Sequence, residues 1–419
     1  MNDSNTQNTS SVVPNVVPDQ SPMSLKLTRT PKYYWFIVIF LVLMSALGSF
    51  VNDMYTPALP AMCHFFGCTV PVGQMGLTMG MIGLAVGQLI LGPMSDRYGR
   101  KPVLIGSVSV FIVAAIASIF SANIHVFNLC RLFQGIGASG GYFLARTIPA
   151  DIYSGRPLAK LMAIIGAING FAPASAPVIG GVTADAYGWK GIFVVLAIFA
   201  LLILLITPFV KESLSVSKRT QGAWWKSMSG YITLLHNHPF VIHVCFKGLA
   251  LGLLFAYISS SPFILQTHYG VSQTVYGLII GFNSLFVMTG SLLALKFKPL
   301  KKAAVIGAWI MTAGVVAQAI ALYSIHNIWV FEICMAVILF GLGLIFTTSN
   351  SLAMNEGRHK AGDASALLGV SGYIVGAVVS PAVGLGNILH STAITYLALS
   401  MLILIFAHAT RKLAPDLGK

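Results

Sequence analysis

The chain has 419 residues, of which 56% are hydrophobic and only 9% are charged, and its mean hydropathy is +0.82. A soluble domain carries about 25% charged residues, so this chain cannot cover itself with a water-compatible surface. The composition excludes an ordinary soluble domain and indicates an integral membrane protein. The formal net charge of +14 has to be explained within that class.

The first 33 residues are rich in Ser, Asn, Thr, Pro and Gln and poor in apolar side chains, which predicts a disordered tail. The first apolar run begins near Tyr34 and is too long for the apolar region of a cleavable signal peptide. We therefore expect it to direct insertion as the first membrane helix.

Apolar runs long enough to cross roughly 30 Å of hydrocarbon follow one another along the rest of the chain. They predict an all-α membrane protein with twelve transmembrane helices in two pseudo-symmetric six-helix bundles. The expected helices cover residues 34–58, 73–94, 103–122, 126–149, 158–182, 190–209, 241–264, 273–295, 303–324, 328–353, 363–386 and 389–409.

The basic residues alternate with these helices in a way that predicts their orientation. Placing both termini on the inner side puts 22 of the 25 Lys and Arg residues there, as the positive-inside rule requires. Only Lys190 falls on the outer side, while Arg131 and Lys247 lie within expected helices. The net charge is therefore a topology signal. We expect a multi-pass protein of the inner (cytoplasmic) cell membrane, in contact with the lipid bilayer, and no nucleic-acid partner.

A polar segment over residues 211–240 divides the expected helices six and six. It predicts an N-terminal bundle over 34–210, a C-terminal bundle over 241–410 and a short cytoplasmic tail over 411–419. An amphipathic helix along the inner interface is expected within this linker, from the residues Trp224, Trp225, Lys226, Tyr231, Leu234 and Leu235.

Glycines and prolines of the two halves repeat at a nearly constant offset. The pairs are Gly135 with Gly341 and Gly137 with Gly343 at 206 residues, Pro57 with Pro262 at 205, and Pro177 with Pro381 and Gly180 with Gly384 at 204. Paired six-helix repeats are typical of transporters that rock around a central site. Two rigid halves whose interface has two packings can interconvert between two states, which a pore or a receptor would not require.

Asp53 lies in the outer half of the first expected helix. An ionisable group inside a span costs at least about 2.5–3.5 kcal/mol, so it normally faces a cavity or a partner. Arg131 lies at a similar depth in the fourth helix and cannot neutralise itself, which makes Asp53 its natural counter-charge. The pair can act as a proton-driven switch. The alternatives are a permanent salt bridge that only orients the helices, or a carboxylate at the outer headgroup level.

Two further charges lie within expected helices. Lys247 could extend its stem towards the inner interface, or it could line a cavity and select against cationic substrates. Glu332, near the outer end of the tenth helix, has the same two interpretations. Aromatic candidates for the cavity are Tyr55, Tyr142, Phe143, Phe255 and Tyr257.

The turn between the second and third helices reads Gly92-Pro93-Met94-Ser95-Asp96-Arg97-Tyr98-Gly99-Arg100-Lys101. Gly92 and Gly99 permit close approach and a tight turn. Asp96 can accept hydrogen bonds from a helix N-terminus, and the start of the eleventh helix near Asp363 is the candidate. A cytoplasmic network that latches one state could be completed by Arg97, Arg100, Arg146 and Asp151.

Cysteines and catalytic motifs add little. Cys63 and Cys68 share a loop with His64; a disulfide or a metal site is conceivable there, and two free thiols are the simpler interpretation. The sequence contains no catalytic constellation and no phosphate-binding loop. We therefore expect no enzyme, no cofactor and no metal, and a transport cycle driven by an ion gradient or by the substrate's own gradient.

Three of these motifs resemble those of the major facilitator superfamily of transporters, and the match covers residues 34–410. The turn Gly92–Lys101 resembles its main signature, Arg131–Gly135 its second motif, and Pro177, Gly180 and Gly181 its antiporter motif in the fifth helix, which implies export. Three further stretches resemble the bicyclomycin-resistance (Bcr/CflA) type of drug exporters: Asp53–Pro60, Phe255–Phe263 and Ala364–Gly369. The resemblance implies drug–proton antiport, with Asp53 as proton carrier and Arg131 as its coupling partner.

The chain departs from that pattern at four places. Alanine stands at 163, 172 and 176, where many antiporters have glycine, and Ser45 stands where some related exporters carry an acid. Lys247 is unusual for the family, and the second-half counterpart of the turn, Lys296–Lys302, has lost its acid. These departures leave the direction of transport and the charge of the substrate open.

The sequence therefore predicts proton-coupled efflux of small amphipathic compounds or drugs by a monomer that works by alternating access. The alternative is an exporter of a native metabolite or siderophore with the same fold, for which drug efflux is incidental.

Overall fold

The computed structural model describes residues 31–153, 155–220, 229–325 and 327–413. Within these ranges the regular structure is helical throughout. Three expectations fall outside the described residues: the disordered tail up to residue 30, the segment around Trp224–Lys226, and residues 414–419. Residues 31–33, assigned to the tail from sequence, already belong to the first helix.

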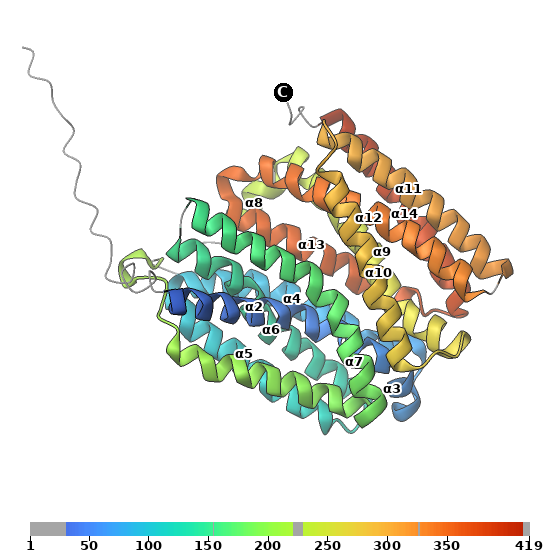
Figure 1. The fold of residues 1–419 in the computed structure, drawn as a ribbon, viewed down its shortest axis with the longest axis horizontal. Coiled ribbons are helices and arrows are strands. Elements are labelled where there is room, and N and C mark those ends of the chain that lie inside the picture. Colours follow the sequence, from blue (N-terminus) through green and yellow to red (C-terminus); the bar gives the residue numbers. More distant parts are fainter. Residues whose placement is uncertain (1–30, 154, 221–228, 326, 414–419) are drawn as a thin grey trace, which may run out of the picture.

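The N-terminal half, residues 31–209, is built from helices that run back and forth (Figure 1). They are α2 (Pro31–Asp53), α3 (Leu59–Phe66), α4 (Val70–Tyr98), α5 (Arg100–Ile119), α6 (Ile124–Ile152) and α7 (Gly155–Ile206). The long α7 contains two crossing helices, because its backbone leaves helical geometry at Gly188, where φ is 69°. Glycine adopts a positive φ without a steric penalty, which explains the bend at this position.

The C-terminal half, residues 238–413, follows a linker that contains the short helix α8 (Ser229–Leu235). Its helices are α9 (His238–Pro262), continued by a π-helical turn (Phe263–His268), then α10 (Gln273–Ala294), α11 (Leu300–Ile320), α12 (Ile328–Glu356), α13 (Ala361–Ala382) and α14 (Ile388–Leu413). Asn237, Ser272 and Asn327 begin three of them by accepting hydrogen bonds from free backbone N–H groups of the first turn, as N-cap residues do.

The twelve expected membrane helices are present. Ten segments of the described chain are long and apolar enough to cross a bilayer. The segment Gly155–Phe209 counts as two because of the bend at Gly188. The twelfth is α6, a 29-residue helix that carries Arg131 and Arg146 and is accordingly less apolar.

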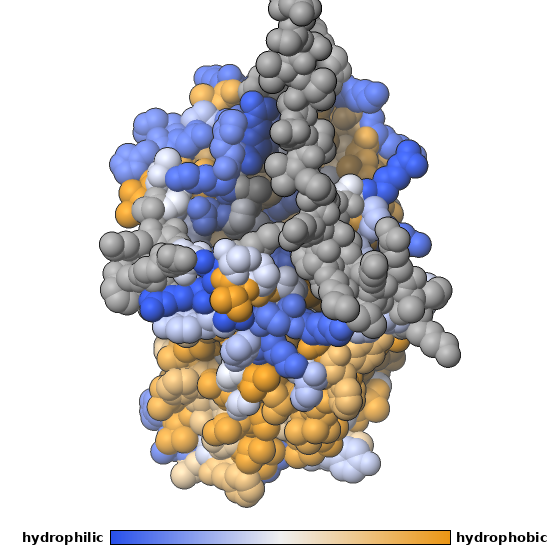
Figure 2. Space-filling view, turned by 90° about the vertical axis from the view of Figure 1, so that its left-hand side faces the viewer, coloured by the Kyte–Doolittle hydropathy of each residue, from blue (hydrophilic) through white to orange (hydrophobic). Residues whose placement is uncertain are grey.

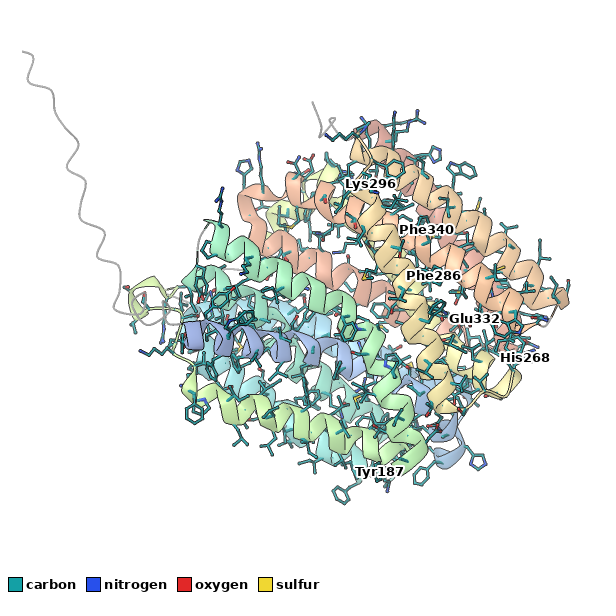
Figure 3. The ribbon with its side chains drawn as sticks, in the orientation of Figure 1. Tyr187, His268, Phe286, Lys296, Glu332 and Phe340 are labelled. Carbon is teal, nitrogen blue, oxygen red and sulfur yellow. The ribbon has the colours of Figure 1, made fainter. Side chains whose placement is uncertain are left out.

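The two ends of the helix bundle differ in charge. We call the end that carries the α4–α5 turn, the linker and the α10–α11 turn the basic end, and the opposite one the far end. Figure 3 marks the basic end by Lys296 and the far end by His268 and Tyr187. Figure 2, which looks at the left-hand side of Figure 1, shows hydrophilic surface above a continuous apolar flank suited to contact with lipid.

The buried apolar side chains form two large clusters. One contains mainly residues of the N-terminal half, such as Leu47, Phe111 and Phe193, and the other residues of the C-terminal half, such as Met311 and Met335. Each half therefore has its own core, as a unit that moves as a rigid body needs.

Glycine contacts inside the two halves are similar. A Cβ on Gly135 of α6 would collide with α4 beside Gly83, and a Cβ on Gly343 of α12 would collide with α10 beside Gly290. Gly137 of α6 packs on α5, and Gly341 of α12 packs on α11. The glycines of α6 and α12 therefore make corresponding helix contacts, although not in the pairwise order of the sequence repeat. Small residues let membrane helices approach closely enough for backbone contact.

Gly83→Val should destabilise the N-terminal half, because the added side chain would meet the Leu132 carbonyl oxygen and the Gly135 backbone. Overpacking typically costs about 1–3 kcal/mol. Thermal unfolding of the purified protein in detergent, monitored by size-exclusion chromatography, measures the loss of stability. Gly106→Val is the matched control, since a Cβ there meets no atom within 4 Å. Equal melting temperatures for the two variants would contradict this account of helix packing.

Candidate functional site

The helix α2 ends in the middle of a membrane-spanning segment, and Asp53 is its last residue. Pro57 lies in a short 3-10 turn (Thr56–Ala58) that separates α2 from α3, and proline cannot donate the next helical hydrogen bond. The Thr56 hydroxyl donates to the Asp53 carbonyl at 2.8 Å, which satisfies one of the carbonyls left free at the helix end. The chain therefore places a carboxyl group at a break in a transmembrane helix.

Arg131 on α6 is completely buried against this break. Its guanidinium donates to the Val51 carbonyl at 2.6 Å and to Asn52 Oδ1 at 3.2 Å. It also donates to Gln134 Oε1 at 2.5 Å and lies 4.1 Å from the centre of the Tyr55 ring. A cation at the C-terminus of a helix is stabilised by the helix dipole and by the free carbonyls. The end of α2 therefore provides part of the compensation for the buried positive charge.

Asp53 and Arg131, which the sequence analysis paired, form no direct salt bridge in the described chain. The ion pairs within the described residues are those of Arg100 with Asp96 and Asp151. Asp53, with 8% of its surface exposed, instead interacts with Arg131 over a longer electrostatic distance. The guanidinium is already occupied by the end of α2, because Val51 and Asn52 lie closer to it than the Asp53 carboxylate does.

Asp53 also lies at the boundary between the two halves. Its charge acts on Tyr276 of α10 and on Tyr373 of α13, both in the C-terminal half. A change in the ionisation of Asp53 would therefore be felt by Arg131 of its own half and by two tyrosines of the other half. This is the arrangement that a coupling residue needs.

The two halves are joined by hydrogen bonds near the far end. Side-chain donors of one half reach backbone or carboxylate acceptors of the other: Gln74 to the Ser259 carbonyl at 3.0 Å, Thr78 to the Ala377 carbonyl at 3.0 Å, Gln266 to the Pro57 carbonyl at 2.9 Å and the Thr274 hydroxyl to Asp185 at 2.5 Å. In Figure 1 the helices of the halves converge near α3 and spread towards α8. The structure is therefore closed at the far end.

The predicted helix-5 motif lies in this closure. A Cβ on Gly180 would collide with the Met54 carbonyl, directly after Asp53, and one on Gly181 with the Gln273 carbonyl of α10. In return, Gly277 of α10 leaves room for the Pro177 carbonyl. The motif thus brings α7 into backbone contact with both the Asp53 segment and the other half.

The predicted latch is only partly assembled. Arg100 pairs with Asp96 at 2.5 Å and with Asp151 at 2.9 Å. Asp96 lies within electrostatic range of Asp363 in the first turn of α13, close to the helix start that the sequence indicates. Burial and the charges of Asp363 and Asp96 raise the pKa of Tyr231 in α8 to about 12, so α8 adjoins the same cluster.

Two arginines assigned to the latch have other contacts. Arg97 lies 5.2 Å from the centre of the Tyr98 ring. Arg146 donates to the Tyr142 hydroxyl at 2.6 Å and lies within electrostatic range of Lys247 of the other half. Its hydrogen bond is therefore with Tyr142 of its own helix, whereas the ion pairs of the cluster are made by Arg100.

Glu212 contacts the same turn as the Arg100 cluster, and the sequence analysis missed it. Its carboxylate accepts hydrogen bonds from the backbone N–H of Arg100 at 3.0 Å and of Lys101 at 3.1 Å. These are free donors at the N-terminus of α5, where an acid is favoured. It could have been suspected only as the single acid in the linker sequence, since its partner is more than a hundred residues away in sequence.

Glu332 and Tyr257, two further candidates for the cavity, lie together in a separate cluster. Glu332 and Tyr257 share Asn283, whose amide lies 2.6 Å from Glu332 Oε2 and 2.7 Å from the Tyr257 hydroxyl. Figure 3 shows Glu332 towards the same end as His268. This cluster belongs to the C-terminal half. The five cysteines are free thiols, and the described residues contain no group of three potential ligands for a metal ion.

A shallow apolar groove of about 450 Å³ lies elsewhere, between α5 and α6, and is lined by side chains such as Val113 and Phe133. Both are exposed on the flank of the bundle. This groove opens on the outer flank of the bundle, and neither Asp53 nor Arg131 lines it.

A bundle of twelve apolar helices, with an interrupted helix and buried charges at the contact of two similar halves, defines a multi-pass membrane transporter. The sequence profile of the Major Facilitator Superfamily matches residues 38–381. The chain therefore belongs to this superfamily, whose members are transporters and not enzymes.

Several proteins of known sequence are similar over most of their length. The chain is 34% identical to an uncharacterized MFS-type transporter, YdgK, of Bacillus subtilis, covering 84% of this chain and 89% of the relative. It is 28% identical to a chloramphenicol resistance protein of Pseudomonas aeruginosa, covering 81% and 82%. It is 25% identical to multidrug resistance protein D of Escherichia coli, covering 80% and 84%.

Solved structures of the same fold include the xylose transporter XylE of Escherichia coli in a partially occluded inward-open conformation. The TM-score is 0.72 at 17% identity, covering 93% of this chain and 99% of the transporter. A bacterial homologue of the lysosomal transporter Spinster, inward-facing and unoccupied, gives a TM-score of 0.68 at 13% identity, covering 91% and 96%. These similarities establish the fold.

Arg131→Lys should impair transport although it keeps the positive charge. Lysine has no planar set of donors for Val51, Asn52 and Gln134. If the poorer positioning of the charge costs about 1.4 kcal/mol of free energy, the corresponding equilibrium changes tenfold. We expect uptake into everted vesicles to fall at least about tenfold at normal membrane abundance. Arg156→Lys, at the exposed start of α7, is the control. Full activity of Arg131→Lys would show that charge alone suffices.

Gly181→Val should prevent the far end from closing, because the side chain would occupy the position of the Gln273 carbonyl. Spin labels on Tyr187→Cys and His268→Cys, in a background without the native cysteines, report the distance between the halves by pulsed electron resonance. We expect a longer distance in Gly181→Val than in the parent or in the control Gly106→Val. An unchanged distance would contradict the role assigned to the helix-5 motif.

Proposed function

We propose that this protein exports small amphipathic compounds in exchange for protons by alternating access. The observation that carries the proposal is the position of Asp53: a nearly buried carboxyl at a helix break, beside a buried arginine, within electrostatic reach of both halves. A carboxyl inside a membrane is a functional group by default, because its ionisation is costly there.

The orientation follows from the charges. The basic end carries the α4–α5 and α10–α11 turns and the linker, so the positive-inside rule assigns it to the cytoplasm. In this proposed orientation the closed far end faces outwards. The proposed location is the cytoplasmic membrane of a bacterial cell, by analogy with the relatives.

In the proposed cycle, Asp53 loses its proton to the cytoplasm as the substrate binds from that side. After the halves rock, Asp53 takes up a proton from outside, which removes its attraction to Arg131 and favours substrate release. The neutral carboxyl can then return through the closed interface at lower cost, and the proton is released inside when the next substrate molecule binds. Only a group whose affinity for the proton differs between the two states can transmit the energy of the gradient.

Drug export is supported by the relatives. The names of two of them refer to chloramphenicol resistance and multidrug resistance, and the Asp53–Pro60 stretch resembles the Bcr/CflA type of exporter. The second candidate, export of a native metabolite or siderophore, shares the same coupling site. Growth inhibition by a drug panel, compared with secreted metabolites in the same strains, separates the two.

Asp53→Asn should abolish proton-driven export while leaving folding intact. The amide keeps the size of the carboxyl and cannot exchange a proton. Substrate accumulation in everted vesicles with an imposed pH gradient measures the effect, and membrane abundance and melting temperature are checked in parallel. We expect export to fall to the background of vesicles without the protein.

Glu356→Gln is the matched control, since it removes an acid at the end of α12, away from the coupling site, and should leave export unchanged. Gradient-driven accumulation by Asp53→Asn at the parental rate would remove the proposed mechanism.

A further inference from the structure

Two basic side chains from opposite halves lie within electrostatic range of each other. They are Arg146 on α6 and Lys247 on α9, at roughly 9 Å and 14 Å of helix rise from the basic ends of their helices. The space between the halves is therefore positively charged on the side of the basic end.

The polar contacts of this pair are uncharged. Arg146 donates to the Tyr142 hydroxyl at 2.6 Å and lies 4.3 Å from the centre of the same ring. Lys247 donates to Asn350 Oδ1 at 2.8 Å. Both ion pairs within the described ranges belong to Arg100. Two half-buried like charges thus lie near each other, and no carboxylate of the described chain pairs with either of them.

An anion between the two cations would relieve this repulsion, because it attracts both at once. Its surroundings would be aromatic: Tyr373 of α13 interacts electrostatically with Tyr142 and Arg146, and its ring lies 5.8 Å from that of Phe255. Hydroxyl and amide groups of Tyr142 and Asn350 complete a polar anchor beside this aromatic wall. A cationic compound would meet two positive charges in the same place.

We propose that this site binds the anionic group of the exported compound, a carboxylate or a comparable monoanion attached to an aromatic or apolar body. The inference rests on the proposed export function and names its substrate class. It assigns Lys247 to the cavity and gives Arg146 a substrate-binding role in place of the latch. Since the two cations belong to different halves, an anion held by both also bridges the halves, and its binding depends on how closely they approach.

The experiment compares 1-naphthoate with 1-naphthamide, which have the same aromatic body and differ in charge. Binding to the full-length protein in detergent is measured by calorimetry at pH 7.5. We expect naphthoate to bind at least about tenfold more tightly, as one charge-assisted contact provides. Lys247→Met and Arg146→Gln should each remove this preference, with naphthamide affinity changed less than naphthoate affinity.

Lys190→Met is the control, because it removes a lysine from the far end and should leave the preference intact. Equal affinities for the two compounds in the parent, tighter binding of the amide, no binding of either, or a preference that survives both substitutions would each overturn the inference. Its failure is distinguishable from failure of the export function: Asp53→Asn should still prefer naphthoate, while proton dependence of export is tested separately.

A second measurement uses charge movement in proteoliposomes. Export of a monoanion against one proton moves two elementary charges in the same direction per cycle, whereas export of a neutral compound moves one. Currents per transported molecule should therefore be about twice as large with naphthoate as with naphthamide, given the charge difference between them. Equal currents per molecule would contradict the export of naphthoate as an anion.

Discussion

The buried guanidinium of Arg131 is the constraint on which the site depends. It is fully enclosed, it stays ionised in proteins, and it is placed against the carbonyls at the end of α2. Removing a charge from water is tolerated only where dipoles or counter-charges replace the water. The break at Pro57 supplies those dipoles, and it also fixes Asp53 as the last residue of the helix. One local interruption thus positions the cation and the carboxyl together.

The two halves contact each other closely through small residues and a few hydrogen bonds. Glycines of α7 and α10 place backbone against backbone at the far end, and a few hydrogen bonds across the halves add direction. Such an interface is tightly packed without large interlocking side chains, so an alternative packing at the opposite end does not require the cores to be rebuilt. The separate apolar cores of the two halves agree with this rigid-body behaviour.

The sequence predicted the fold well because its determinants are local. Helix number and length follow from apolar runs matched to membrane thickness, and the bend that divides α7 follows from Gly188. Asp53 and Arg131 were also singled out from the chain, whereas the helix break before Pro57 was not predicted, because the first helix was expected to run over residues 34–58.

The geometry of the site was less predictable, because it depends on contacts between distant residues. The sequence paired Asp53 with Arg131, but the acceptors next to the guanidinium are Val51 and Asn52. A backbone carbonyl leaves no signature in a sequence. Arg146 was assigned to the latch, whereas its hydrogen bond is with Tyr142 and it lies within electrostatic range of Lys247. Glu212 was missed because the linker gives no periodic pattern from which to infer a contact.

The central claim is that Asp53 exchanges a proton as the substrate binds, and direct counting of protons tests it. The purified protein, in weakly buffered detergent solution with a pH indicator, is mixed with a transported compound at saturating concentration. The account predicts release of about one proton per protein molecule as Asp53 becomes ionised, and no release from Asp53→Asn. Equal proton release from the parent and from Asp53→Asn, or none from the parent, would contradict it.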